Sequence, residues 1–169
     1  LLLVLSSGDA HKNPSPSQHM KDISFCHLNV RSLSLDKLKC IRSDLVLEFD
    51  IISLSESFLS PTSPASNLAI PDYYDIIRKD RLNAIGGGVA LYVSKPLQVT
   101  RRLDLELPDL EILWCEIRLN NTKFLFAVVY RPPNSPVSFW TNFQESFDLA
   151  KGTCIHNIIL TGDLICDSR

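Results

Sequence analysis

Three polar side chains that could act together, Asn29, Glu56 and Asp163, each follow or close a short apolar segment. In open α/β sheets, ligands bind beyond the carboxyl ends of strands, because side chains leave the packed core there while the rigid backbone positions them. Two carboxylates and an amide suit one Mg²⁺ ion, which prefers oxygen ligands and can polarise a phosphoryl oxygen. The same residues also fit ordinary roles as a turn cap, a solvated carboxylate and a loop start. The spacing alone leaves both interpretations open.

A second candidate segment reads Tyr-Arg-Pro-Pro-Asn at residues 130–134 and closes the segment with the most regular alternation. Tyr130 could hydrogen-bond a phosphate, and Arg131 could hold one in bidentate fashion. A strand that ends at two prolines, with Arg131 in solvent, explains the segment equally well.

Two other features give weaker signals. The three glycines at residues 86–88 are followed by neither Lys-Ser nor Lys-Thr and lead into a strand, so they predict a tight turn and no nucleotide loop. We interpret the four histidines, including His27 inside a strand, as structural or surface residues, and none is placed by the sequence to pair with Asp163.

The elements that must position these residues follow from hydrophobic periodicity. Leu35, Leu38, Ile41 and Leu45 recur at helical spacing after Ser34, which predicts an N-capped helix over residues 35–48. Three phenylalanines at residues 139, 143 and 147 mark a second helix. The Pro- and Ser-rich residues 60–72 predict a loop, and residues 119–122 a hairpin turn. Strands are expected at residues 23–29, 50–55, 74–78, 88–94, 97–103, 112–118, 123–130 and 158–161. This order predicts a mixed α/β chain with more than one sheet or a long meander.

Composition narrows the class of protein. The chain has 169 residues, of which 45% are hydrophobic and 21% charged, and its net charge is −2. These values are typical of a globular domain and argue against disorder. Near-neutral charge provides no general attraction to nucleic acid, although an enzyme could hold a phosphate through a metal ion and local bases such as Arg78, Lys79 and Arg81.

The apolar residues 1–5 are too few for a membrane span of about 20, so a membrane partner is unsupported. Five widely spaced cysteines predict free, buried thiols in a reducing compartment.

Five sequence blocks, taken in order, resemble the endonuclease domain of non-LTR (LINE-type) retrotransposons, a branch of the endonuclease/exonuclease/phosphatase superfamily. The resemblance covers about residues 22–167. The blocks are HLNVRSL at residues 27–33, DIISLSESFL at 50–59, RKDR with GGGVALYV at 78–81 and 86–93, VYRPPN at 129–134, and LTGD at 160–163.

The resemblance implies a four-layer sandwich of two mixed β-sheets flanked by helices. It also implies hydrolysis of phosphodiester bonds with Mg²⁺, or Mn²⁺ in its place. Asn29 and Glu56 resemble the residues that organise the metal, Tyr130 the phosphate-site tyrosine, and Asp163 the aspartate that positions or activates water. Arg131 is our hypothesis for a DNA-backbone contact.

The implied partners are target DNA and a reverse transcriptase domain of the same polyprotein. Nicking of the DNA would leave a 3′-hydroxyl that primes reverse transcription. An intracellular location, nuclear and/or cytoplasmic, follows from this role and from the free thiols.

The resemblance also divides the chain. Residues 1–21 form a polar linker similar to a decayed ribosome-skipping segment, and residues 22–169 a partial endonuclease domain that we expect to be truncated at its C-terminus. Ile165 replaces an asparagine of the family pattern, and the family's Ser-Asp-His motif has no counterpart here. We therefore expect the chain alone to be inactive and poorly soluble. Two alternatives stay open: a superfamily phosphatase or RNA-trimming enzyme, and a nonenzymatic binding domain.

Overall fold

The computed structural model describes residues 23–82 and 85–164. Its elements, in chain order, are β1 (Phe25–Asn29), α1 (Leu35–Asp44), β2 (Ile51–Ser55), α2 (Ala65–Leu68), β3 (Ile77–Lys79), β4 (Val89–Val93), β5 (Gln98–Arg101), a 3₁₀ turn (Leu103–Leu105), β6 (Glu111–Leu119), β7 (Thr122–Tyr130), α3 (Ser138–Lys151) and β8 (Ile158–Asp163). None of the helices in these residues is long and apolar enough to cross a bilayer.

The strands form two mixed sheets of four strands each. The first sheet has the order β1-β2-β4-β3, and the second has the order β5-β6-β7-β8. In each sheet only one neighbouring pair is parallel, β1 with β2 and β7 with β8. The other pairs are antiparallel. Each parallel pair is joined through a helix, α1 in the first sheet and α3 in the second.

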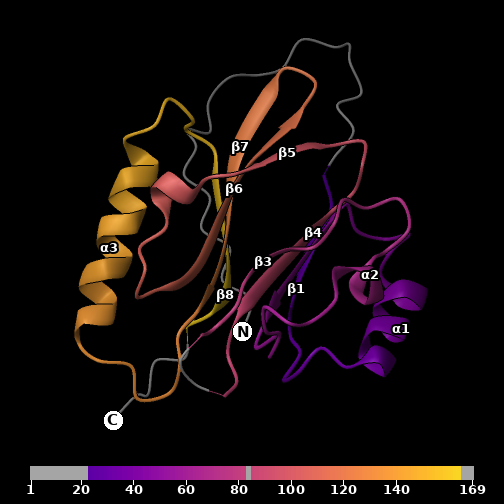
Figure 1. The fold of residues 1–169 in the computed structure, drawn as a ribbon. Coiled ribbons are helices and arrows are strands. Elements are labelled where there is room, and N and C mark those ends of the chain that lie inside the picture. The colour runs from indigo at the N-terminus through magenta and orange to yellow at the C-terminus, as the bar shows by residue number, and fades with distance from the viewer. Residues whose placement is uncertain (1–22, 83–84, 165–169) are drawn as a thin grey trace.

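The sheets stack face to face, with α1 and α2 on one outer side and α3 on the other (Figure 1). Three apolar clusters hold these four layers together. One lies between the sheets and includes Ile51 and Phe126. A second packs Leu38 and Ile41 of α1 onto the first sheet. A third packs Phe139 and Ala150 of α3 onto the second sheet. The predicted four-layer sandwich of two mixed sheets is confirmed.

Several predicted element limits are wrong. The first helix ends at Asp44 and not at residue 48, and the following turn leads the chain back into β2. The predicted loop 60–72 contains the short helix α2. The strand expected at residues 74–78 is confined to Ile77–Lys79, and the strand expected at 97–103 stops at Arg101. It stops there because Leu103–Leu105 turn into a 3₁₀ helix.

Other expectations are met. Ser34 caps α1, since its side chain accepts a hydrogen bond from the amide of Lys37. All three glycines at residues 86–88 have positive φ and turn the chain into β4. Cys26, Cys40, Cys115 and Cys154 are free thiols, but the expected burial is wrong for Cys40 and Cys154, which are exposed. Cys166 lies outside the described residues. The linker at residues 1–21 and Ile165 lie outside the described residues.

Candidate functional site

The two parallel strand pairs end at the same place, and this brings the predicted residues together. Asn29 is the last residue of β1 and pairs in register with the end of β2, directly before Glu56. Tyr130 and Asp163 are register partners at the ends of β7 and β8. Each sheet therefore contributes two side chains from the carboxyl ends of adjacent parallel strands, where functional side chains commonly gather.

Asn29 joins the two sheets at this end. Its Nδ2 donates to Glu56 Oε1 at 2.6 Å and to Asp163 Oδ2 at 2.8 Å. Its Oδ1 accepts from the backbone amide of Arg31 at 3.2 Å, which orients the amide group. One neutral donor group thus holds two carboxylates from different sheets close to each other.

Tyr130 lies behind Glu56. Its side chain is 5% exposed, and its hydroxyl is hydrogen-bonded to Glu56. Burial, with the nearby charge of Glu56, raises the pKa of Tyr130 to about 12, so the hydroxyl keeps its proton at neutral pH. Tyr130 can therefore donate a hydrogen bond to an anion. We call Asn29, Glu56, Tyr130 and Asp163 the catalytic cluster, after the role that the sequence predicts for them.

The backbone at the site is constrained in two places. Gly162, before Asp163, has φ +147°, and a Cβ there would overlap the carbonyl oxygen of Val129 on β7. The residue must be glycine for β8 to approach β7 so closely. Glu56 has φ +54°, a left-handed conformation that is costly for a residue with a side chain. Such strain is found most often at functional positions.

A buried polar network ties the sheets together beneath the catalytic cluster. His27 Nδ1 lies 3.0 Å from Ser53 Oγ, and its Nε2 lies 3.2 Å from Ser55 Oγ. Thr161 of β8 donates from Oγ1 to Ser53 Oγ at 3.1 Å across the sheets. Burial lowers the pKa of His27 to about 4, against an opposing influence of Asp163. His27 is therefore a neutral structural histidine, as expected, but its proximity to Asp163 was not predicted.

Arg131 lies to one side of the cluster. Its backbone amide donates to the carbonyl of Asp163 at 2.9 Å, which extends the β7–β8 ladder by one residue. Its guanidinium lies over two aromatic rings of α3, with Cζ 5.8 Å from the Phe139 centroid and 5.5 Å from the Trp140 centroid. The structure thus places the predicted phosphate contact next to the site, on an aromatic support.

Sequence reasoning missed one ion pair at the site. Arg81 pairs with Glu111 and lies 5.8 Å from the Tyr130 ring centroid. The other oxygen of Glu111 accepts from the amide of Gly88 at 2.6 Å. The pair fastens the glycine turn beside Tyr130. Only the family block that contains Arg81 hinted at it, because Glu111 lies 30 residues away.

The donor set fits a hard divalent cation. Within residues 23–82 and 85–164, neither Glu56 nor Asp163 forms a salt bridge. No group of three or more His, Cys, Asp and Glu side chains in that part of the chain could hold a metal ion. Two carboxylates beside an amide suit Mg²⁺, which usually keeps several waters and needs few protein ligands. Glu56 and Asp163 would hold the ion, and Asn29 would fix their orientation.

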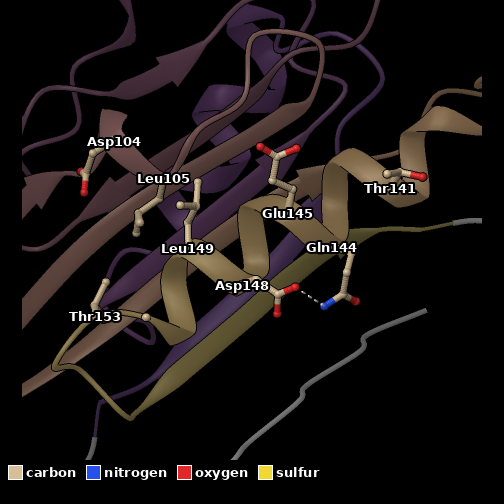
Figure 2. Close-up of a pocket in the computed structure, with 9 residues that line it drawn as sticks. Asp104, Leu105, Thr141, Gln144, Glu145, Asp148, Leu149 and Thr153 are labelled. Carbon is tan, nitrogen blue, oxygen red and sulfur yellow. Dashed lines mark hydrogen bonds between the residues drawn. The ribbon is translucent and has the colours of Figure 1, made fainter.

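A large surface cavity lies away from the catalytic cluster. It has a volume of about 680 Å³, and Asp104, Glu145 and Asp148 are among the residues that line it. Figure 2 shows these acids along α3 and the 3₁₀ turn, with Gln144 donating to Asp148. Three carboxylates would repel a phosphate, so this groove is a poor substrate site despite its size.

Comparison with known proteins shows the family and the fold of the chain. A family model described as "Endonuclease/Exonuclease/phosphatase family" matches residues 27–164. A comparison with curated proteins finds no match.

Three solved structures share the fold. The endonuclease domain of TRAS1, a telomere-specific non-LTR retrotransposon, is 13% identical with a TM-score of 0.65, and the match covers 86% of this chain and 62% of that chain. A 3′-5′ exonuclease from Neisseria meningitidis is 20% identical with a TM-score of 0.60, covering 84% and 57%. The human Nocturnin catalytic domain is 15% identical with a TM-score of 0.54, covering 83% and 63%.

The chain thus spans less than two thirds of these three structures. The matched region begins at His27 and ends at Leu164, so it includes all four residues of the catalytic cluster and the strands that carry them. By this match and by its fold, the chain belongs to the endonuclease/exonuclease/phosphatase family.

Proposed function

We propose that the catalytic cluster hydrolyses phosphodiester bonds of DNA, as part of a non-LTR retrotransposon endonuclease that nicks target DNA. The bridge from Asn29 to Glu56 and Asp163 carries the proposal, because it joins two carboxylates from different sheets without a charged partner in the described residues. Similarity to the TRAS1 endonuclease domain supports the retrotransposon role. A reverse transcriptase domain of the same polyprotein would then extend the nicked strand, in the nucleus and/or cytoplasm.

Each residue has a separate task in this proposal. Asp163 orients a water molecule and accepts its proton as the water oxygen bonds to phosphorus. When substrate binds, the hydroxyl of Tyr130 turns from Glu56 and donates its hydrogen bond to a phosphoryl oxygen. The bond from phosphorus to the 3′-oxygen breaks, and this oxygen takes up a proton from bulk water to leave a 3′-hydroxyl, with the phosphate on the 5′ side of the break. Glu56 and Asp163, oriented by Asn29, would hold Mg²⁺, or Mn²⁺ in its place, and the ion would supply positive charge against the charge that develops on the phosphate.

Nicking of supercoiled plasmid tests the proposal. We expect the 169-residue chain alone to be inactive, and the chain extended along its natural reading frame to nick in the presence of Mg²⁺. In the extended protein, Asp163→Ala should lower the nicking rate by at least about 10²- to 10³-fold, the loss typical of one preorganised group in an active site. Unchanged nicking by that variant would show that the site is assigned wrongly.

Phosphomonoester hydrolysis is the second candidate. It is favoured by similarity to a Neisseria structure described as the 3′ phosphatase NExo bound to a product DNA hairpin, which is 18% identical with a TM-score of 0.53. Release of inorganic phosphate from a 3′-phosphorylated hairpin, without nicking of plasmid, would favour this function over the endonuclease.

A further inference from the structure

Trp140 is one of three exposed aromatic residues in the described chain, with Phe58 and Tyr74, and it is the one that lies against Arg131. Its side chain is 40% exposed, whereas Trp114, the other tryptophan of the sequence, is completely buried. Trp114 donates its indole N–H to Ser146 Oγ at 2.9 Å. Among the residues that the structure describes, none accepts a hydrogen bond from the indole of Trp140. A large aromatic ring is thus left open to solvent in the first turn of α3.

The orientation of this ring is determined by its neighbours. Phe139 and Phe143 meet Trp140 edge to face, with centroid distances of 5.3 and 6.1 Å and interplanar angles of 88° and 90°. The Arg131 guanidinium lies 5.5 Å from the Trp140 centroid. Because two rings and a cation surround it, the indole is a rigid surface that needs little ordering when a ligand binds.

Arg131 links the ring to the catalytic cluster. Arg131 follows Tyr130 directly, and its amide is bonded to the backbone of Asp163. The Arg131 side chain then reaches α3, so it connects the cluster to Trp140. A ligand that contacts Tyr130 or Asp163 through one phosphate would have its neighbouring groups near Arg131 and Trp140.

We propose that Trp140, with Arg131 beside it, is the stacking site for a nucleobase of the substrate strand next to the bond that is cleaved. The inference rests on the proposed function, since it takes the substrate to be a nucleic acid strand. An indole face and a guanidinium match the two parts of a nucleotide, a flat base and a phosphate. The preference for a splayed, single-stranded base follows, because a base inside a duplex has both faces covered.

Two features of the surface argue for a nucleotide over a protein partner. At the start of α3 only Val137 and Trp140 are exposed large hydrophobic residues within the described chain, which is far less than the roughly 1,000 Å² of a stable protein interface. Further along α3, Glu145 and Asp148 line the acidic groove and would repel phosphates. The contact is therefore limited to the first turn, enough for one base.

Tryptophan emission of the full chain provides a direct test, because Trp114 is buried and any change caused by a ligand reports Trp140. Without divalent metal, a single-stranded oligomer of thymidines should quench the emission. An oligomer of equal length and charge that lacks bases should not quench it, and it should bind roughly tenfold more weakly in fluorescence anisotropy. Trp140→Leu should bind the thymidine oligomer as weakly as the abasic one, while Val137→Ala, at the neighbouring exposed position, should bind it normally.

Equal affinity for the two oligomers, or binding without a change in emission, would overturn the proposal and would show a contact of Arg131 with phosphate only. No binding of either oligomer would overturn it as well. These results are separate from the nicking experiment. Stacking together with nicking that does not depend on Asp163 would refute the assigned site alone, and Asp163-dependent nicking without stacking would refute only the role of Trp140.

Discussion

Two groups of acidic side chains in this protein have opposite surroundings. In the catalytic cluster, Glu56 and Asp163 are held by the neutral amide of Asn29. We call a second group, Glu106 with Arg101 and Lys79, the charge cluster. Both carboxylate oxygens of Glu106 accept hydrogen bonds from Arg101, at 3.0 and 2.9 Å. Lys79 lies 3.7 Å from the same carboxylate. Within the described residues, the carboxylates of the catalytic cluster have no cationic partner, whereas the Glu106 carboxylate has two.

The difference separates the candidate functional site from a structural group of ion pairs. A buried carboxylate is stable only when hydrogen bonds or opposite charges compensate its lost hydration. Glu106, with a side chain that is 4% exposed, receives this compensation from the protein itself. The catalytic cluster keeps two carboxylates near each other at a partly exposed edge, where a divalent cation can provide it. Four variants or conditions test this contrast through the free energy of unfolding.

The largest effect is expected in the charge cluster. Glu106→Ala leaves Arg101 and the half-buried Lys79 without their shared carboxylate, and should lower the free energy of unfolding by about 3–5 kcal/mol. Urea denaturation measures this change. In the control, Asp104→Asn breaks an exposed pair with Arg102 and should cost less than about 1 kcal/mol. Similar losses of unfolding free energy in the two variants would mean that the buried Glu106 pairs stabilise the protein no more than the exposed Asp104–Arg102 pair.

A pH effect is expected beneath the catalytic cluster. Burial lowers the pKa of His27 to about 4, below the value near 6.5 of an unfolded chain, so between these pH values the unfolded state binds more protons. The free energy of unfolding should therefore fall by on the order of 2–3 kcal/mol as the pH drops from 6.5 to 4. His27→Gln should lack this part of the pH dependence. An identical pH profile in the variant would indicate that the pKa of His27 is the same in the folded and unfolded states, which would contradict its burial as a neutral residue. Stability that rises as the pH drops would instead indicate a charged His27 paired with Asp163.

A smaller loss is expected at the glycine before Asp163. Gly162→Ala forces a Cβ against the carbonyl of Val129 and should lower the free energy of unfolding by about 2 kcal/mol. Gly152→Ala is the matched control, because Gly152 has φ −70° and a Cβ there would make only ordinary contacts. It should leave stability unchanged or raise it slightly. Equal effects of the two variants would contradict the close approach of β7 and β8.

The smallest change in stability is expected in the catalytic cluster itself. Glu56→Gln and Asp163→Asn each remove one of two adjacent negative charges, and should raise the free energy of unfolding by about 0.5–1 kcal/mol in metal-free buffer. The same variants should weaken Mn²⁺ binding by at least about 10- to 100-fold, as calorimetric titration would measure. Lower stability with unchanged Mn²⁺ affinity would make the cluster a structural one like that of Glu106.

The strands were predicted best where the pattern is local. Residues 124–130 form an unbroken apolar run and not an alternating one, because β7 (Thr122–Tyr130) is buried on both faces. The end of α1 was predicted four residues too late, because Leu45 continues the apolar spacing although it packs against the first sheet from the following turn. The helix α2 gave no signal, since residues 60–72 are rich in proline and serine. Contacts made by the tertiary structure override local preference at such places.

The sequence predicted which residues form the site, but it did not predict the contacts between them. Asn29, Glu56 and Asp163 were singled out because each stands at the end of an apolar segment. The structure places the carboxylates of Glu56 and Asp163 within hydrogen-bond distance of the Asn29 side-chain amide. The partnership of Arg81 with Glu111 and of Ser53 with Thr161 was missed. These contacts join residues that are 30 and 108 positions apart, and no periodicity records them.

The sequence by itself determined the strands, the two helices with clear periodicity, and the polar residues that stand at strand ends, because these depend on neighbours within one or two turns of chain. Only the tertiary structure decided that Asn29 serves two carboxylates and that Glu106 is neutralised while Glu56 and Asp163 are not. The reason is that an apolar core between two sheets sets the distance and register of their edges. The charge that surrounds each acid is therefore a property of the stacked sheets.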